Sequence, residues 1–342
     1  MIQTEALIIG AGPVGLFQAF QLGLQDIRCH VVDALPQVGG QCVELYAHKP
    51  IYDIPGIPYC TGQELIDQLQ KQVKPFAPQF HLQELVSELK VTQEGHWHVQ
   101  TDKGTQFKAS TVFIAAGVGA FVKRGLNLDG FDELLGTSIF QSTPNASSFK
   151  GKHLIVLGDS DAALQACAQW RQGSDAAASV TLVHRRDQFQ AEPQAIEDMR
   201  QACANHSMRF VAGQPTGLVQ ARGQLTGLEI LNAQGDNEVL PANAMLLCLG
   251  VSPKLGPLSD WGLAMERKQL RVNTETYATE AKGIFAVGDI NTYPGKKKLI
   301  VCGFHEATLA AFGASALLRP DQKTLLQYTT TSTHLHNLLG VS

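Results

Sequence analysis

The sequence contains no pair of cysteines in the C-x-x-C spacing of a redox-active dithiol or a zinc ligand pair. Its seven cysteines stand apart, at positions 29, 42, 60, 167, 203, 248 and 302. Because no metal-ligand spacing is present, we predict no metal site. Scattered thiols of this kind are typical of a reducing compartment, so we expect a cytoplasmic protein.

Long apolar runs and an excess of positive charge are also missing. A membrane-spanning helix needs about 20 apolar residues, whereas the first apolar run here is broken by Gly10 and Gly12 and follows a start with no basic residue. We expect neither a targeting signal nor a membrane span. Lys and Arg number 27 against 31 Asp and Glu, which gives a net charge of −4, so we expect no nucleic-acid partner.

The clearest pattern that is present lies between Thr4 and Asp33. The apolar run Ala6–Ile9 is typical of a buried parallel strand, the glycine-rich segment 10–15 follows it, and apolar residues then recur at helical spacing as far as Leu24. A second strand, Cys29–Val32, leads to Asp33. A glycine-rich segment alone would indicate only a turn, but strand, turn, helix, strand and acid in this order predict a dinucleotide-binding unit.

Each position of this unit has a chemical reason. The first glycine permits a tight turn, the second lets the backbone approach a pyrophosphate, and the third lets the helix pack on the strand. The helix N-terminus offers free N–H groups and partial positive charge to phosphates, and the acid can accept hydrogen bonds from a ribose. We therefore predict cofactor-binding roles for Gly10, Gly12, Pro13, Gly15 and Asp33.

The same order of elements occurs again about 150 residues later. His153–Leu157 is predicted as a strand, 158–163 as the turn, Asp161–Trp170 as a helix, and Ser179–Val183 as a strand that leads into His184-Arg185-Arg186. An NAD site would carry an acid at this strand end, whereas arginines suit the ribose 2′-phosphate of NADPH. The alternative is a basic strand end that is only solvated.

Several shorter elements complete the expected fold. We predict helices at Glu64–Val73 and Glu306–Leu318 and strands at Phe80–Leu89, His96–Thr101, Phe107–Ala109, Thr111–Gly117, Leu228–Asn232, Met245–Leu249 and Gly283–Asp289. No low-complexity linker separates them. A chain of 342 residues with two such units predicts two domains.

Three further motifs decide which proteins the chain is similar to: Gly39-Gly40-Gln41, Ala115-Ala116-Gly117 and Ala286-Val287-Gly288-Asp289. With the two nucleotide units they make nearly the whole chain resemble the thioredoxin reductase-like flavoproteins. Thioredoxin reductases relay electrons through a C-x-x-C disulfide, and segment 136–152 here has no cysteine. The branch that the chain most resembles is the thioredoxin reductase-like ferredoxin–NADP reductase, through segments 35–41, 51–56, 288–296 and 327–332.

This resemblance implies an α/β fold with two Rossmann-like domains. The FAD-binding domain would consist of residues 1–119 and 248–342, the latter with a tail that covers the flavin, and the NADP-binding domain of residues 120–247. The implied activity is hydride transfer from NADPH to flavin N5 and single-electron transfer to ferredoxin or flavodoxin, without a redox disulfide. The implied assembly is a homodimer.

The resemblance also implies the cofactor contacts. Tyr52 and Tyr328 would stack on the two faces of the flavin, which excludes water and oxygen; the alternative is a turn residue and a packed tail. The other residues implied in FAD binding, beyond the five of the first unit, are Gly40, Gln41, Tyr46, Val86, Ala116, Gly117, Phe121, Asp289, Thr329 and Thr330. For Val86 and Phe121 the alternative is core packing, and for the threonines an exposed surface position.

In the second unit the implied NADP-binding residues are Gly158, Ser160, Asp161, Ala162, His184, Arg185 and Arg186. Two positions depart from the family pattern. Ser160 stands where the family has glycine, so its side chain could crowd a pyrophosphate, and Gln190 stands where the family has a third basic residue. Both departures weaken the expected preference for NADPH over NADH.

Two questions remain open from the residues alone. The basic run Lys296–Lys298 could steer an acidic ferredoxin, although such a run is more often a solvated face. The chain could instead be a quinone- or diaphorase-type FAD reductase, or a flavin-binding sensor that has lost nucleotide turnover, as Ser160 and Gln190 would suggest.

Overall fold

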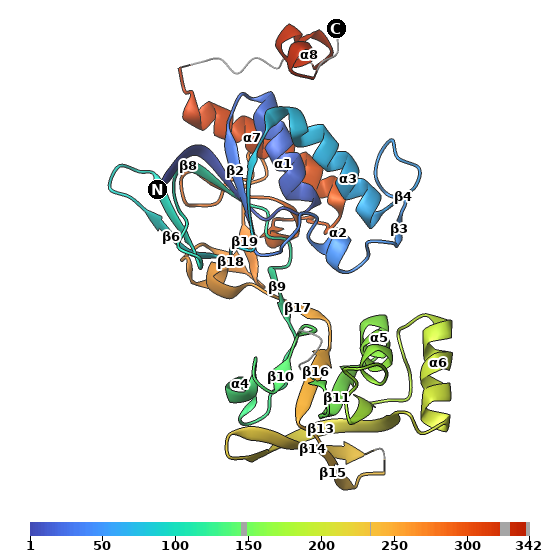
Figure 1. The fold of residues 1–342 in the computed structure, drawn as a ribbon. Helices are drawn as coiled ribbons and strands as arrows, with labels where there is room; N and C mark the ends of the chain where they lie inside the picture. Colours follow the sequence, from blue (N-terminus) through green and yellow to red (C-terminus); the bar gives the residue numbers. More distant parts are fainter. Residues whose placement is uncertain (145–148, 233, 322–328, 340–342) are drawn as a thin grey trace. The chain divides into compact units, whose positions relative to one another are not determined.

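The computed structural model describes residues 1–144, 149–232, 234–321 and 329–339. The chain divides into two compact units, one made of Met1–Phe121 and Pro253–Ser342 and the other of Val122–Ser252 (Figure 1). The first division falls two residues after the predicted position 119, and the second falls five residues after position 247. The two connecting segments, β9 (Ala120–Lys123) and β17 (Val251–Lys254), pair with each other.

The first unit is built on a seven-stranded sheet. Its strand order is β5 (Gln79–Leu82), β2 (Cys29–Asp33), β1 (Ile2–Ile9), β8 (Gln106–Ile114), β7 (Trp97–Thr101) and β6 (Val86–Val91), with β20 (Ile284–Ala286) also pairing with β8. Strand β1 runs parallel to β2 and β8, whereas β6, β7 and β8 pair antiparallel.

The apolar run of β1 explains its central place in the sheet. Ala6 and Ile8 belong to one buried cluster and Leu7 and Ile9 to another, so successive side chains enter cores on opposite faces. A parallel strand covered on both faces needs such an uninterrupted apolar run. The strand therefore holds the turn that follows it at a fixed position at the edge of the sheet.

Helices α1 (Pro13–Leu24), α3 (Gly62–Val73) and α7 (Ile300–Leu318) belong to the same unit, and α1 contacts both others. Helix α3 begins with a capping box, in which the Glu64 N–H donates to Thr61 Oγ1 at 3.2 Å and the Thr61 N–H donates to the Glu64 carboxylate at 2.7 Å. Helix α7 begins six residues before the predicted start at Glu306. Its first two turns are apolar on most sides, so periodicity gave no boundary there.

Within the described residues α7 is the one helix long and apolar enough to cross a membrane. Length and composition alone are weak evidence, because the core helix of a soluble protein passes the same test. The buried side of α7 is formed mainly by small residues such as Gly303, Ala307 and Ala310, and the helix contacts α1. The absence of a membrane span stays a prediction.

The second unit contains another seven-stranded sheet, ordered β10 (Ile139–Phe140), β16 (Ala244–Cys248), β11 (His153–Gly158), β12 (Ser179–His184), β13 (Arg209–Ala221), β14 (Gln224–Asn232) and β15 (Asn237–Pro241). Pairing is parallel from β10 to β13 and antiparallel from β13 to β15. Helix α5 (Asp161–Trp170) has the predicted bounds, and α6 (Pro193–Ala204) follows β12. The predicted α/β class with two Rossmann-like units is confirmed.

The predicted strands Phe107–Ala109 and Thr111–Gly117 belong to one continuous strand, β8, and Gly283–Asp289 is a strand only over Ile284–Ala286. The prediction for Phe80–Leu89 is also wrong, because this segment is two strands, β5 and β6. Gln83 between them has φ 58°, a left-handed conformation that breaks a strand. The remaining elements are α2 (Gln41–Glu44), β3 (Pro50–Ile51), β4 (Cys60–Thr61), η1 (Lys74–Phe76), α4 (Phe131–Leu134), η3 (Gly256–Asp260), β18 (Met265–Glu266), β19 (Gln269–Arg271), η4 (Gly288–Ile290), β21 (Asn291–Thr292), η5 (Thr329–Thr331) and α8 (Thr333–Leu339).

Candidate functional site

The glycine turn between β1 and α1 has the geometry of a phosphate-binding turn. Gly10 has φ 110°, and a Cβ there would lie 2.4 Å from the Ala115 carbonyl oxygen. A Cβ on Gly15 would lie 1.9 Å from the Gly10 carbonyl oxygen. These two glycines are therefore required by the protein's own backbone.

Gly12 differs from its neighbours, because the protein itself does not need a glycine there. It is the N-cap of α1 with φ −70°, and the nearest atom to an added Cβ is Gly40 Cα at 4.0 Å. The open space beside Gly12 borders a cavity, and Pro13 occupies the first turn of the helix. The space suits a group that approaches the backbone closely, as a pyrophosphate does at a helix N-terminus.

Asp33, at the end of β2, is held by the same turn. Its Oδ2 accepts a hydrogen bond from the Ala11 N–H at 2.6 Å, and its Oδ1 accepts one from the Leu35 N–H at 2.8 Å. Burial raises the pKa of the Asp33 carboxyl, and the two backbone donors only partly oppose this effect. The carboxylate is thus oriented at the cavity edge, where it can accept a hydrogen bond from a ribose hydroxyl.

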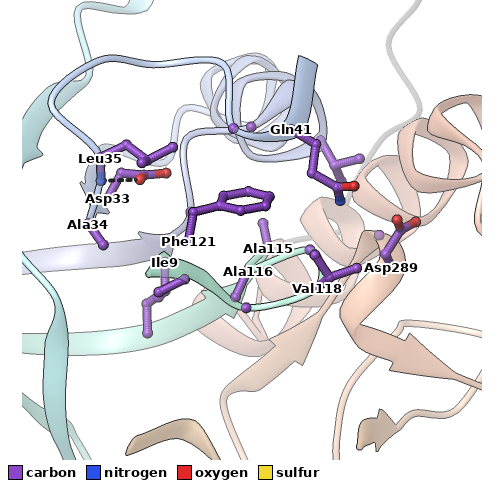
Figure 2. Close-up of a pocket in the computed structure, with 18 of the residues that line it drawn as sticks. Ile9, Asp33, Ala34, Leu35, Gln41, Ala115, Ala116, Val118, Phe121 and Asp289 are labelled. Atoms are coloured by element: carbon purple, nitrogen blue, oxygen red, sulfur yellow. Dashed lines mark hydrogen bonds between the residues drawn. The ribbon is translucent and has the colours of Figure 1, made fainter. Parts of the chain in front are cut away.

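The cavity encloses about 1070 Å³ of empty space, including its open mouth, and all of its lining belongs to the first unit. Figure 2 shows the ring of Phe121 between Asp33 on one side and Gln41 and Asp289 on the other. The predicted FAD-binding residues that line it are Gly10, Gly12, Pro13, Asp33, Gly40, Gln41, Tyr46, Val86, Ala116, Gly117, Phe121 and Asp289. They come from segments up to 279 positions apart, as Gly10 and Asp289 show.

Other predicted residues lie outside this lining. Gly15 packs beneath the turn, against Gly10. Tyr52 is 69% exposed, and its ring centroid lies 5.8 Å from that of Tyr59. Thr329 and Thr330 are exposed in η5, and Tyr328 lies outside the described residues. Flavin stacking by the two tyrosines stays a prediction.

Helix α8, which follows η5, contacts η1. Phe76 of η1 lies against Gly23, near the C-terminal end of α1, whereas the cavity lies at the N-terminal end of that helix. Helix α8 therefore packs near the end of α1 that is opposite the cavity.

Sequence reasoning missed much of the wall: Ile9, Val14, Val32, Ala34, Leu35, Glu84, Leu85, Ala115, Val118, Gly119, Ala120, Leu255, Leu258, Trp261, Gly288 and Ile300. Most are apolar, with no local signal to separate them from core residues. Trp261 also lines the cavity, and its Nε1 is buried within the protein without a hydrogen-bond partner among the described residues.

The basic run divides in the structure. Lys296 has a side chain only 7% exposed and is ion-paired with the fully buried Glu306. Lys297 and Lys298 are exposed. The expectation of three solvated lysines is wrong for Lys296, because a buried carboxylate on α7 draws it into the interior.

In the second unit the turn forms without a glycine at position 160. Ser160 has φ −97° and ψ 169°, an extended conformation that any residue adopts, and its side chain makes no capping hydrogen bond. Gly158 does need to be glycine, since a Cβ there would lie 2.5 Å from the Cys248 carbonyl oxygen. The Gln190 N–H donates to the Asp159 carbonyl at 2.7 Å, which brings Gln190 beside the turn.

The end of β12 lies next to this turn. His184 Nε2 is 3.7 Å from the Asp159 carboxylate, and its Nδ1 is 2.9 Å from the Arg186 carbonyl oxygen. Arg185, Arg186 and Ala162 are exposed. Both arginine side chains are thus accessible to a phosphate in solution.

Comparison with known proteins decides the family. Residues 4–308 match the family described as pyridine nucleotide-disulphide oxidoreductase. The chain belongs to this family. Members are FAD-dependent and use a pyridine nucleotide, and FAD fits the first unit, because Gly12 leaves the close approach free and Asp33 is oriented at the cavity edge.

The similarity to individual relatives extends over nearly the whole of both chains. The chain is 51% identical to a ferredoxin–NADP reductase of Polaromonas sp. strain JS666, over 99% of this chain and 93% of the relative. It is 53% identical to one of Paracidovorax citrulli, over 100% and 97%. The solved thioredoxin reductase of T. acidophilum shares the fold, with 19% identity and a TM-score of 0.55 over 93% of this chain and 99% of that one.

Proposed function

We propose that this protein is an FAD-dependent reductase that transfers electrons between NADPH and ferredoxin. The observation that carries the proposal is the identity of 51% to 53% with proteins named ferredoxin–NADP reductase over nearly the whole of both chains. A 19% likeness to a thioredoxin reductase supports only the fold.

In the first unit the chain's own residues hold the cofactor. The N-terminus of α1, with Gly12 and Pro13, binds the pyrophosphate, and Asp33 accepts hydrogen bonds from the adenosine ribose. Gln41 and Asp289 line the cavity together with Ile300, at the N-terminus of α7, and would hold the ribityl and ring part of FAD. When bound, FAD supplies both two-electron and one-electron chemistry, and the walls exclude water from it.

In the second unit the N-terminus of α5 receives the NADPH pyrophosphate. Arg185 and Arg186 bind the 2′-phosphate through charge-assisted hydrogen bonds, which NADH could not use. Ser160 narrows the approach to the backbone without straining the turn, since its φ is ordinary. NADPH affinity should therefore be lower than with glycine at this position.

Electrons leave without a disulfide relay in this proposal. All seven cysteines are free thiols, and none lines the cavity. Cys42, next to Gln41 in sequence, is fully buried, and burial raises the pKa of its thiol, so little thiolate is present to react. In this proposal the electrons pass singly to an external iron–sulfur or flavin partner.

The finer points of the proposal are a cytoplasmic homodimer and ferredoxin or flavodoxin as the acceptor. Exposed Lys297 and Lys298 support docking of an acidic acceptor. Support for the homodimer comes only from the resemblance, so its mass in solution is the measurement that decides it.

Anaerobic titration of the purified yellow protein tests the whole proposal. NADPH should bleach the flavin absorbance, NADH should do so at much higher concentration, and added ferredoxin should restore the colour. If quinones or dyes reoxidise the protein and ferredoxin does not, the diaphorase-type alternative is correct. Failure of NADPH to bleach the flavin at all would favour the sensor.

A further inference from the structure

A buried ion pair in the first unit has no part in the function described so far. Glu306, on α7, is completely buried, and Lys296, in the loop before that helix, is 7% exposed in its side chain. Charges taken out of water are costly unless they are paired and hydrogen-bonded throughout. The groups that hydrogen-bond to this pair therefore show what the pair holds in place.

Both oxygens of Glu306 are fully used. Oε2 accepts hydrogen bonds from the Gly288 N–H at 2.7 Å and from Asn291 Nδ2 at 2.8 Å. Oε1 accepts one from the Tyr293 hydroxyl at 2.9 Å and one from the Lys296 ammonium. Burial raises the pKa of Tyr293, which keeps its hydroxyl protonated as a donor.

The two members of the pair converge on one glycine. Glu306 receives the Gly288 N–H, while the Lys296 ammonium donates to the Gly288 carbonyl at 2.9 Å. Gly288 has φ 79° and opens the short helix η4. A backbone unit in this left-handed conformation, with both polar groups held by buried charges, has little freedom to turn.

This glycine forms part of the cavity wall. Gly288, Asp289 and Ile300 all line the cavity, and Figure 2 shows Asp289 pointing toward it near Gln41. Any rotation of the Gly288 backbone would redirect the side chain of the next residue. The ion pair thus lies behind the wall and holds the backbone that leads into Asp289.

A neutral side chain could not replace Glu306 in this arrangement. Four donors converge on its two oxygens. Glutamine has one acceptor oxygen and an NH₂ group. Its NH₂ group would therefore point at two of the four hydrogen-bond donors, and these donors would have no acceptor. Glutamine would also leave the Lys296 ammonium buried without a counter-charge.

We propose that Glu306 and Lys296 are positioning residues for FAD, which act by fixing the Gly288–Asp289 turn against the cofactor. The proposal rests on the proposed function, in that it takes FAD to occupy the cavity. It assigns Lys296 to cofactor positioning and leaves Lys297 and Lys298 as the exposed part of the basic run.

The experiment compares holoprotein variants Glu306→Gln and Lys296→Met with Lys297→Met, a matched control at the exposed neighbour. Dilution of each holoprotein, followed by the fluorescence of released FAD, gives the FAD dissociation constant. We expect an increase of at least about tenfold for the two buried positions, equal to about 1.4 kcal/mol, with a shifted flavin absorption maximum. The control should stay within about twofold of the wild type.

A purely structural role predicts a different result. If the buried variants lose thermal stability but keep the FAD dissociation constant and absorption maximum of the control, the proposal is overturned. Should either variant fail to fold, Tyr293→Phe decides, because it removes one donor and leaves the charges paired; a constant unchanged from the wild type overturns the proposal. A wild type that retains no FAD would instead overturn the proposed function.

Discussion

Alanine substitutions at Gly10 and Gly12 distinguish a glycine that the fold requires from a glycine that cofactor binding requires. Gly10 and Gly12 lie two positions apart in the same turn, yet their surroundings differ. A Cβ on Gly10 would lie 2.4 Å from a backbone oxygen at φ 110°, whereas a Cβ on Gly12 would find its nearest atom at 4.0 Å at φ −70°. Alanine should therefore harm the two positions in different ways.

The expected sizes follow from these distances. Gly10→Ala forces backbone apart and adopts a conformation unfavourable for alanine, so we expect a loss of about 3 kcal/mol or more in the free energy of unfolding. Gly12→Ala meets no such conflict, and its effect on the flavin-free protein should stay within about 1 kcal/mol. Its methyl group would occupy the space for the pyrophosphate, so the FAD dissociation constant should rise about tenfold or more.

Two measurements check the pair. Chemical unfolding of flavin-free protein gives stability, and release of FAD on dilution gives the dissociation constant. A Gly12→Ala variant with wild-type FAD affinity would show that the pyrophosphate does not approach this turn. A Gly12→Ala variant as unstable as Gly10→Ala would show that the space beside Gly12 is filled by the protein itself.

Three further predictions concern the second unit and the pH dependence of stability. Ser160→Gly should lower the NADPH dissociation constant about threefold or more by opening the approach to the backbone, with FAD binding unchanged as the control; an equal or higher constant contradicts this. Arg185→Ala with Arg186→Ala should raise the KM for NADPH about tenfold or more and leave that for NADH nearly unchanged; equal losses for both nucleotides would remove the 2′-phosphate site. Burial, and next the charge of His81 whose Nε2 lies 3.0 Å from His30 Nδ1, lower the pKa of His30 below 6.5. The folded protein therefore binds this proton less tightly than the unfolded chain, so stability is complete above about pH 6.5 and falls as the pH drops toward the lowered pKa. The thermal midpoint of unfolding should decrease on acidification, and it should decrease less in His30→Phe. A thermal midpoint that rises on acidification would refute the predicted direction.

Features set by local backbone conformation were predictable. Helix α5 begins at Asp161 and ends at Trp170, as predicted, because a turn with Gly158 and an amphipathic run define both ends. The strands that lead to Gly10 and Asp33 are identified by uninterrupted apolar runs. The start of α7 was not predictable, since apolar residues surround its first turns and no capping side chain marks Leu299.

Contacts that depend on how a loop folds against another element were not predictable. Nothing in the sequence separates Lys296 from Lys297 and Lys298, and only the folded loop before α7 brings Lys296 to Glu306. Trp261 enters the cavity wall from η3, far in sequence from the glycine turn.

The sequence by itself determined the two glycine turns, their strands and helices, and the family, because these depend on backbone conformations and apolar patterns that nearby residues dictate. Only the tertiary structure decided which side chains share the cavity wall and which lysine is buried. Whether a side chain is buried depends on partners that other segments supply. A carboxylate on one helix can hold a lysine ammonium in the interior, together with the turn beside it, although the local sequence would leave that ammonium in water.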